Sequence, residues 1–225
     1  MKASIIIRVY NAEKTIERAI QSALHQNFPE KDFEIIIVND GSTDGTRRLL
    51  EQYVSLPNVK IFDQENKGGT ATANKGLEES RGEYVTILDS DDAFESDLLK
   101  ELSSALDAHP ETIFAYPDYY EKKNGSKIYV SPKNIFETTA VGILFRRERL
   151  KEAGWYRDNI FFAEYDLMLR TMDDWKGIHI SKPLFIYYRS RIGNTSDADR
   201  VAKGIDELLA LHSDKSVFIK KIRGY

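Results

Sequence analysis

Residues 84–92 read YVTILDSDD, an apolar run that ends in three aspartates within four positions. The run has the length and composition of a buried strand, so the acids arrive together at its C-terminal end. In open α/β sheets, ligands bind at that end of the strands. Carboxylates this close raise one another's pKa unless a positive charge lies between them, and a hard divalent cation is the usual partner. The stretch therefore predicts an α/β sheet with a cation or ligand site at its edge.

Strand-like and helix-like segments alternate through the first 110 residues. Apolar residues recur at helical spacing within 12–25, directly after the apolar run 4–9. This β-α repetition predicts parallel pairing, right-handed crossovers and a doubly wound sheet. The predicted order is strand 4–9, helix 12–25, strand 33–38, helix 46–54, strand 58–62, helix 70–80 and strand 84–88.

The pattern changes after Pro110. Asn124 and Gly125 separate two β-rich segments, 113–120 and 127–130, which predicts a hairpin. A strand over 139–145, a helix over 163–172 and a strand over 182–188 are predicted after it. Because no repeat and no linker interrupts the chain, we expect one α/β domain over 1–196, followed by a C-terminal helical tail over 197–225. Its mainly parallel, nucleotide-type half is 1–110, and its smaller mixed half is 111–196.

Composition excludes several classes of protein. Lys and Arg number 32 against 36 Asp and Glu, a formal charge of -4, which is not the broad basic surface of a nucleic-acid binder. The absence of cysteine excludes disulfides, thiolate metal sites and cysteine nucleophiles, and fits a reducing compartment. No stretch approaches the roughly 18 apolar residues of a membrane span, and the first residues lack a signal-peptide core. A cytoplasmic protein is expected.

The C-terminal segment 213–225 mixes basic with apolar residues. Such a mixture can contact an anionic membrane surface. Peripheral contact with the inner face of a membrane, packing in a homodimer and simple solvation all stay open.

Several segments together resemble the family-2 glycosyltransferases, which are inverting enzymes of the GT-A fold. They occur in the family's order and spacing, strongly from residue 3 to about 110 and more weakly to about 196. The segments are SIIIRVYN (4–11), EIIIVNDGSTDGT (34–46), NKG (66–68), NKG (74–76), GEYV (82–85) leading into DSDD (89–92), and EYDL (164–167).

The resemblance implies a site for a nucleotide-sugar donor. Tyr10 would pack against the nucleobase, and Asp40 would accept a hydrogen bond from it. Asp89 and Asp91 would hold the ribose and the metal-bound diphosphate, with Asp92 as a further metal ligand. The expected cofactor is Mn²⁺ or Mg²⁺, because carboxylates are the ligands that such ions prefer. The other expected donor contacts are Val9, Asn11, Lys67, Asn74, Ser90 and Arg191.

Three positions depart from the family's pattern. Arg8 replaces the proline usual after the first strand, and Ala73 stands where many relatives have arginine. Phosphate contact would then fall to Lys67 or Lys75. Arg191 stands where relatives often carry a histidine near the metal; an arginine cannot ligate a metal but can grip a diphosphate.

An inverting transfer also needs a base that takes the proton of the acceptor hydroxyl. The family's base position falls on Glu164, and Asp166 is the alternative. Glu164 could instead simply favour the positive N-terminus of its helix. Trp155, Tyr156, Phe161 and Phe162 precede it, either as a platform for acceptor sugars or as core residues.

The expected function is metal-dependent inverting transfer of a sugar from a UDP- or dTDP-sugar to a hydroxyl of a saccharide or lipid-linked acceptor. Two other classes share the nucleotide-binding half. A sugar nucleotidyltransferase normally carries a glycine-rich loop after its first strand, which residues 8–11 do not provide. A non-catalytic module that binds sugar nucleotides or carbohydrate is the other alternative.

Overall fold

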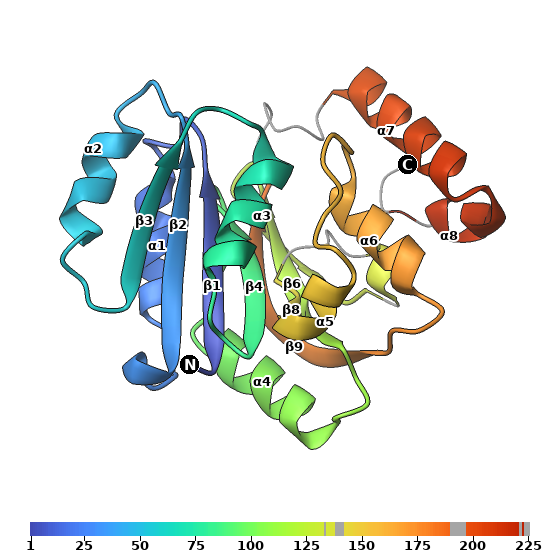
Figure 1. Ribbon diagram of the computed structural model, residues 1–225, viewed down its shortest axis with the longest axis horizontal. Helices are drawn as coiled ribbons and strands as arrows, with labels where there is room; N and C mark the ends of the chain where they lie inside the picture. Colours follow the sequence, from blue (N-terminus) through green and yellow to red (C-terminus); the bar gives the residue numbers. More distant parts are fainter. Residues whose placement is uncertain (133, 138–141, 190–196, 221, 223–225) are drawn as a thin grey trace.

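The first four strands alternate with helices and pair in parallel, as the sequence predicts (Figure 1). Strand β1 pairs with β2 on one side and with β4 on the other, and β2 pairs with β3. The computed structural model describes residues 1–132, 134–137, 142–189, 197–220 and 222. The elements of the first half are β1 (Ala3–Val9), α1 (Ile16–Leu24), β2 (Phe33–Asp40), α2 (Thr46–Leu50), β3 (Val59–Gln64), α3 (Gly69–Glu79), β4 (Tyr84–Asp89), β5 (Ala93–Phe94) and α4 (Leu98–Ala108).

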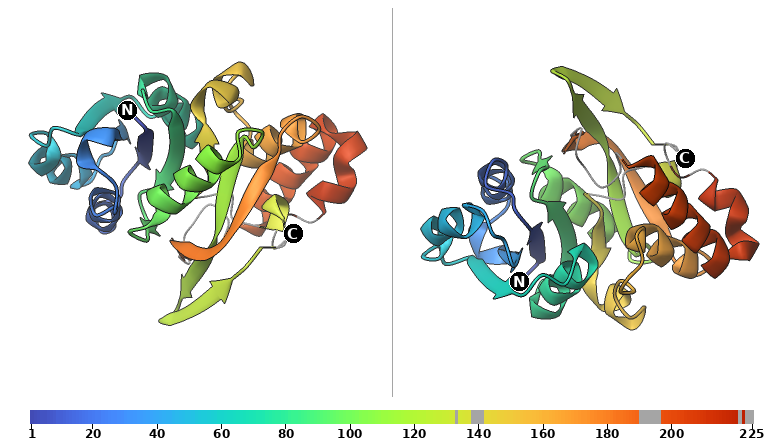
Figure 2. Two further views of the ribbon diagram at one scale, coloured as in Figure 1. Left: turned by 90° about the horizontal axis from the view of Figure 1, so that it is seen from below. Right: turned by 90° about the horizontal axis from the view of Figure 1, so that it is seen from above.

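The second half extends the same sheet with strands of mixed direction. β8 pairs antiparallel with β4, and β6 follows in the order β3-β2-β1-β4-β8-β6-β9-β5. β7 pairs with β6 and forms the predicted hairpin, which projects from the body of the molecule in Figure 2. The elements of this half are β6 (Phe114–Lys123), β7 (Ser126–Val130), β8 (Leu144–Arg146), α5 (Arg147–Glu152), α6 (Ala163–Thr171), β9 (Gly177–Tyr188), α7 (Ala198–Leu211) and α8 (Ser216–Ile219), and short 3-10 turns lie at Glu30–Asp32, Glu51–Tyr53, Ile135–Glu137 and Ser213–Lys215.

Helices cover both faces of the sheet because the central strands are apolar on both sides. On β1, Ile5 and Ile7 point into the cluster that contains α1 and α4, whereas Ile6 points into the cluster that contains α3 and α6. Every residue of β2 is buried, as expected for a parallel strand with two covered faces. The predicted architecture, a mainly parallel α/β sheet joined to a smaller half with strands of mixed direction, is confirmed.

The predicted boundaries are less accurate in the second half. The strand predicted over 139–145 appears as β8, which is three residues long; residues 138–141 lie outside the described part of the chain. The two-residue strand β5 is not predicted, because its pairing with β9 depends on a partner about 90 residues away.

The C-terminal tail packs onto the second half. Val201 and Leu208 of α7 and Ile219 of α8 are buried in the same apolar cluster as α6. Figure 1 places α7 and α8 along the outer side of α6. Among the described residues, no helix combines the length and the apolar character needed to cross a bilayer.

Candidate active site

The carboxyl ends of β1 and β4 bring Arg8 and Asp89 side by side. The two residues are partners in the β1–β4 register. Because side chains alternate along a strand, Arg8 follows Ile6 and Asp89 follows Val85 onto the sheet face that α6 covers. The first turn of α6 carries Glu164. The alternation therefore directs a cation and two acids into one place.

Arg8 forms ion pairs with both acids. Its Nε and Nη2 atoms contact the two oxygens of Asp89, with Nη2 3.2 Å from Oδ2. The same Nη2 lies 3.0 Å from Oε1 of Glu164. The three side chains are between 19% and 27% exposed, so the ion pairs are only partly screened by water. Arg8 thus fixes the position of the candidate base relative to the acidic cluster.

Tyr156 is buried next to this group. Burial raises the pKa of its hydroxyl, the charges of Glu164 and Asp89 raise it further, and the guanidinium of Arg8 opposes them. The phenol therefore stays neutral at physiological pH. In the sequence Tyr156 is only one of four neighbouring aromatic residues, and nothing there indicates that it lies beside Glu164.

Asp89, Asp91 and Asp92 each offer a carboxylate oxygen within 4.8 Å of the others. Burial raises the pKa of Asp92 well above its ordinary value, and the charges of Asp89 and Asp91 add to the effect. The pKa of Asp91 is raised by burial first and by Asp89 second. The sequence prediction that these acids form one cluster is confirmed.

One oxygen of Asp92 is satisfied and the other is not. Oδ1 accepts a hydrogen bond of 2.8 Å from the backbone N–H of Tyr188, at the end of β9. Oδ2 is buried and has no hydrogen-bond partner among the described residues. A buried carboxylate oxygen without a donor is costly unless a cation reaches it. The cluster therefore fits a hard divalent cation.

Arg18 of α1 contacts the loop after β4 that carries Asp91, a role that no sequence pattern indicated. Its Nη2 donates to the backbone carbonyl of Asp91. Its guanidinium carbon lies 3.6 Å from the ring centroid of Tyr188, a cation-π distance. The loop after β4 and the end of β9 are thereby tied to α1.

The end of β1 is buried and the chain emerges directly after it. Val9, the last residue of β1, is 1% exposed, whereas Tyr10 is 50% exposed. Asn11, with φ of 47°, accepts a 2.7 Å hydrogen bond from the backbone N–H of Thr43. Asn11 therefore fastens the end of β1 to the loop after β2.

Asp40 holds the chain's own backbone. Its Oδ1 accepts from Gln64 Nε2 and Lys67 N, both at 2.8 Å, and its Oδ2 accepts from Gly68 N at 2.9 Å. The side chain is 3% exposed. The nucleobase contact implied by the resemblance would have to share oxygens that already serve three donors. In the structure, Asp40 anchors the turn at residues 66–68.

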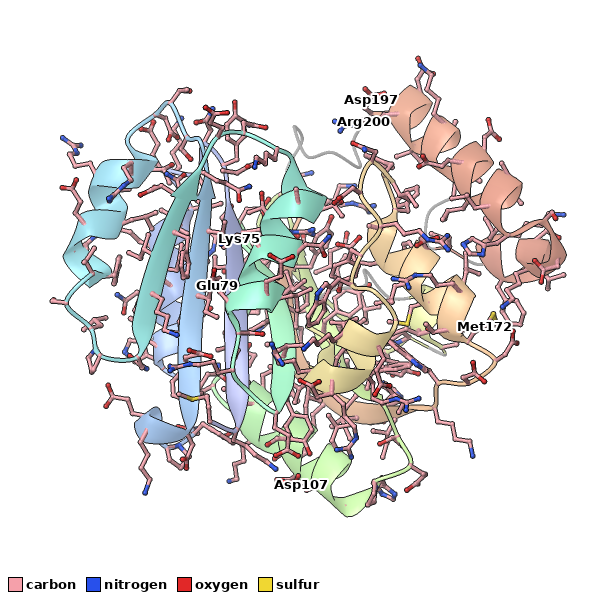
Figure 3. All side chains as sticks on the ribbon, viewed as in Figure 1. Lys75, Glu79, Asp107, Met172, Asp197 and Arg200 are labelled. Carbon is pink, nitrogen blue, oxygen red and sulfur yellow. The ribbon has the colours of Figure 1, made fainter. Side chains whose placement is uncertain are left out.

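Asn74 is likewise occupied by the chain. Its side-chain amide bonds both the carbonyl of Tyr156, at 2.8 Å, and the N–H of Tyr156, at 3.1 Å. It therefore joins α3 to the loop before α6. Lys67 is exposed, and Lys75 pairs with Glu79 along α3 at 2.7 Å (Figure 3). Ser90 is half-buried between the acids, and Arg191 lies outside the described residues.

Asp166, the alternative base, is not brought to the site. It is fully buried, and its carboxylate lies 3.1 Å from Arg157, 2.8 Å from His212 and 3.3 Å from Arg170. Arg170 also donates to the backbone carbonyls of Ala153 and Trp155. Asp166 therefore joins α6 to the end of α7 and to the loop after α5.

Replacing Asp166 by asparagine is expected to lower the free energy of unfolding by about 2–4 kcal/mol, because the two arginines and His212 lose a buried counter-charge. Urea unfolding of the purified chain measures this. The matched control is Asp173→Asn, since Asp173 pairs with Lys215 at 2.8 Å but is 78% exposed; a loss below about 1 kcal/mol is expected there. Equal losses in the two variants would contradict the structural role.

Acidic side chains at the carboxyl edge of a mainly parallel sheet lie where open α/β proteins bind their ligands. The sequence model of the family described as Glycosyl transferase family 2 matches residues 4–175, and the chain belongs to this family. The Staphylococcus aureus poly(ribitol-phosphate) beta-N-acetylglucosaminyltransferase TarS is 32% identical over 152 residues, which are 67% of this chain and 26% of TarS. The Bacillus subtilis minor teichoic acid biosynthesis protein GgaA is 33% identical over 181 residues, which are 76% of this chain and 39% of GgaA. The chain thus spans well under half the length of these curated relatives.

Solved structures agree with this assignment. TarS 1–349 in complex with UDP-GlcNAc superposes with a TM-score of 0.77 and 25% identity, over 93% of this chain and 66% of that chain. A mannosyltransferase from Pyrobaculum calidifontis, solved with GDP-Man and Mn²⁺, gives a TM-score of 0.78 and 17% identity, over 98% of this chain and 68% of that chain. At this lower identity the likeness shows the fold alone.

Proposed function

We propose that this chain transfers a sugar from a UDP- or dTDP-sugar to an acceptor hydroxyl with inversion at the anomeric carbon, and that a divalent cation at Asp91 and Asp92 is required. The observation that carries the proposal is the buried Asp92 oxygen without a donor, in a cluster that Arg8 links to Glu164. The division of labour between residues 1–110 for the donor and 111–196 for the acceptor is part of the proposal.

The donor is inferred from a relative. TarS, whose structure was solved with UDP-GlcNAc, is similar over 93% of this chain, and UDP-GlcNAc is therefore the first donor to test. The exposed Tyr10 is available to pack against the base; Val9 is the last residue of β1, and Ser90 follows the last residue of β4. TarS acts on poly(ribitol-phosphate) by its name, and GgaA takes part in minor teichoic acid synthesis. A hydroxyl of a saccharide, polyol or lipid-linked acceptor fits this group.

The reaction assigns a role to each carboxylate. The oxygen of the acceptor hydroxyl bonds to the anomeric carbon of the donor sugar, and Glu164 accepts the proton of that hydroxyl. The bond from that carbon to the diphosphate breaks, and its electron pair leaves with the nucleoside diphosphate. A cation of the Mn²⁺ or Mg²⁺ type, when bound, neutralises the charge that develops on this leaving group. Arg8 holds the carboxylate of Glu164 in place through their ion pair.

The direct test is nucleotide binding together with transfer. Titration calorimetry of the chain with UDP is expected to show binding in Mn²⁺ or Mg²⁺ and at least a tenfold weaker signal in EDTA, because a cation bridges carboxylates and diphosphate. GDP is the matched control nucleotide. Release of UDP from UDP-GlcNAc in the presence of saccharide and polyol acceptors measures transfer.

Two results would contradict the proposal in different ways. UDP affinity that EDTA leaves unchanged would remove the metal requirement. Nucleotide binding without transfer or donor hydrolysis across a broad acceptor panel would instead favour a non-catalytic binding module.

A further inference from the structure

A second polar cluster lies in the second half of the sheet. It consists of Asp118 on β6, Tyr129 on β7 and His179 on β9. The side chain of Asp118 is fully buried although it carries a carboxylate, and the proposed transfer leaves it unused. A buried carboxylate needs hydrogen-bond donors, so the partners of Asp118 indicate what the cluster does.

The register of the sheet places Asp118 level with Asp89. Val85 of β4, Phe145 of β8 and Phe114 of β6 pair with one another in one line across the sheet. Because β4 and β6 are both antiparallel to β8, they run in the same direction, and Asp89 and Asp118 each stand four residues beyond that line. Neighbouring strands lie about 4.8 Å apart, so the backbones of the two acids are separated by roughly 10 Å at the carboxyl edge.

The two acids also share a face of the sheet with the candidate base. Val85 and Phe114 belong to the apolar cluster that α6 covers, and side chains four residues further along a strand point to the same face. Over this face, the first turn of α6 carries Glu164, which is tied to Asp89 through Arg8. The Asp118 cluster therefore flanks the candidate active site from the second half of the chain.

Asp118 fixes the orientation and the tautomer of His179. Its Oδ1 lies 2.7 Å from Nε2 of His179, and its Oδ2 accepts from the hydroxyl of Tyr129. Since an ionised carboxylate only accepts hydrogen bonds, Nε2 carries the hydrogen and Nδ1 of the neutral ring has a lone pair. Tyr116 stacks on the imidazole, with 5.0 Å between ring centroids and 21° between planes. The imidazole is thus held by one edge and by one face.

The other ring nitrogen of His179 is open to a ligand. Nδ1 makes no hydrogen bond with any described residue, yet it is not buried. The side chain of His179 is 27% exposed. A fixed acceptor nitrogen next to aromatic rings suits a sugar or a polyol, because such molecules offer hydroxyl donors together with apolar C–H faces.

We propose that Nδ1 of His179 binds a hydroxyl of the acceptor, with Asp118 and Tyr129 as positioning residues. The inference rests on the proposed function and deepens it by assigning a contact for the acceptor on β9. The bound hydroxyl is a different one from that which Glu164 deprotonates, because roughly 10 Å separates the strands that carry Asp118 and Asp89. His179 is therefore a determinant of acceptor binding.

The direct test is NMR of the imidazole nitrogens in the chain labelled with ¹⁵N-histidine. The chain has four histidines, and replacing each by glutamine in turn assigns the ring signals. The probes are ribitol and the methyl glycoside of N-acetylglucosamine, each titrated without nucleotide. The Nδ1 signal of His179 is expected to move upfield as a hydroxyl donates to it. Its Nε2 signal should stay, because the hydrogen bond to Asp118 is kept.

A second arm uses UDP-GlcNAc with Mn²⁺ in place of the probes, because a donor sugar also carries hydroxyls. An Nδ1 signal that moves only with UDP-GlcNAc would make the donor the ligand of His179 and overturn the inference. A signal that neither probe moves would overturn it as well. If UDP fails to bind, the proposed function is wrong, but the titration of His179 with ribitol still gives its result.

Kinetics give a second measurement. Glutamine in place of His179 keeps an amide N–H for Asp118 but presents no acceptor at the position of Nδ1. The acceptor KM is expected to rise by about three- to tenfold, as for the loss of one hydrogen bond, with kcat and UDP affinity unchanged. An unchanged acceptor KM would contradict the inference.

The matched control is His109→Gln. His109 also pairs with an acid, Glu111, at 3.4 Å, but its side chain is 48% exposed. It lies at the opposite edge of the sheet, two residues after Asp107, which accepts from the hydroxyl of Tyr84 at the start of β4 (Figure 3). The control is expected to leave the acceptor KM as it is in the unmodified chain, and an equal rise in both variants would overturn the assignment of His179.

Discussion

Glu164→Gln is expected to lower sugar transfer by about 10²–10⁴-fold, the usual contribution of a positioned general base. Glutamine keeps the size of the side chain and can still accept a hydrogen bond from Arg8, so the geometry at 3.0 Å is retained in large part. It cannot take the proton of the acceptor hydroxyl. The initial rate of UDP release with acceptor present measures the loss.

UDP binding separates the base from a donor ligand. Arg8 still pairs with Asp89 in the variant, and the acidic cluster is unaltered. Titration calorimetry should therefore give a UDP affinity within about twofold of the unmodified chain. The control Glu152→Gln changes an acid that is 63% exposed at the end of α5 and is expected to keep full activity. Transfer within threefold of the original rate in Glu164→Gln would remove Glu164 from the mechanism.

The sequence predicted the sheet well because the pattern that encodes it is local. Apolar strands alternate with amphipathic helices, and the acids of YVTILDSDD follow their strand without interruption. Once β4 is parallel to β1, the cluster must lie at the carboxyl edge. The three acids could thus be placed together from sequence alone.

The contacts of Arg8 could not be predicted from a local pattern. The sequence shows that arginine replaces the family's proline at position 8, but the ion pair of Arg8 with Glu164 joins residues 156 positions apart. Strand alternation places Arg8 on the face of Ile6, and this much was available from the sequence. That α6 begins opposite that face depends on how β8 and the loop after α5 are packed.

Asp40 and Asn74 have contacts that the sequence did not predict, for a related reason. Both were expected to contact the donor, and both hold backbone groups of the chain's own loops. The type of a polar residue in a motif does not show whether its side chain binds a ligand or stabilises a turn. Most of their partners are backbone atoms, which carry no sequence signal.

Asp92→Asn is expected to remove most cation binding while leaving the metal-free protein as stable as before, or more so. Asparagine keeps an oxygen for the 2.8 Å hydrogen bond from Tyr188 N. It also removes an ionised group that burial, Asp89 and Asp91 disfavour, which is why the pKa of Asp92 is raised. A folded-state pKa above the unfolded value means that stability is present at low pH and is lost as the pH rises and Asp92 ionises. In EDTA, the unmodified chain should therefore lose melting temperature toward alkaline pH more steeply than Asp92→Asn.

With Mn²⁺ present, the unmodified chain is expected to be more stable than Asp92→Asn at alkaline pH. The reason is that a cation binds the ionised form of the carboxylates and releases protons on binding. At a concentration 100 times its dissociation constant, a ligand adds about 2.7 kcal/mol to the free energy of unfolding, or about 5–10 °C for a chain of this length. The unmodified chain should show that gain at pH 8 and a smaller one at pH 5.5, where protons compete. Asp92→Asn should gain less than about 2 °C at either pH, and the control Asp214→Asn, at an exposed position after α7, should match the unmodified chain. An equal Mn²⁺ gain in Asp92→Asn would show that the buried oxygen is not a cation ligand.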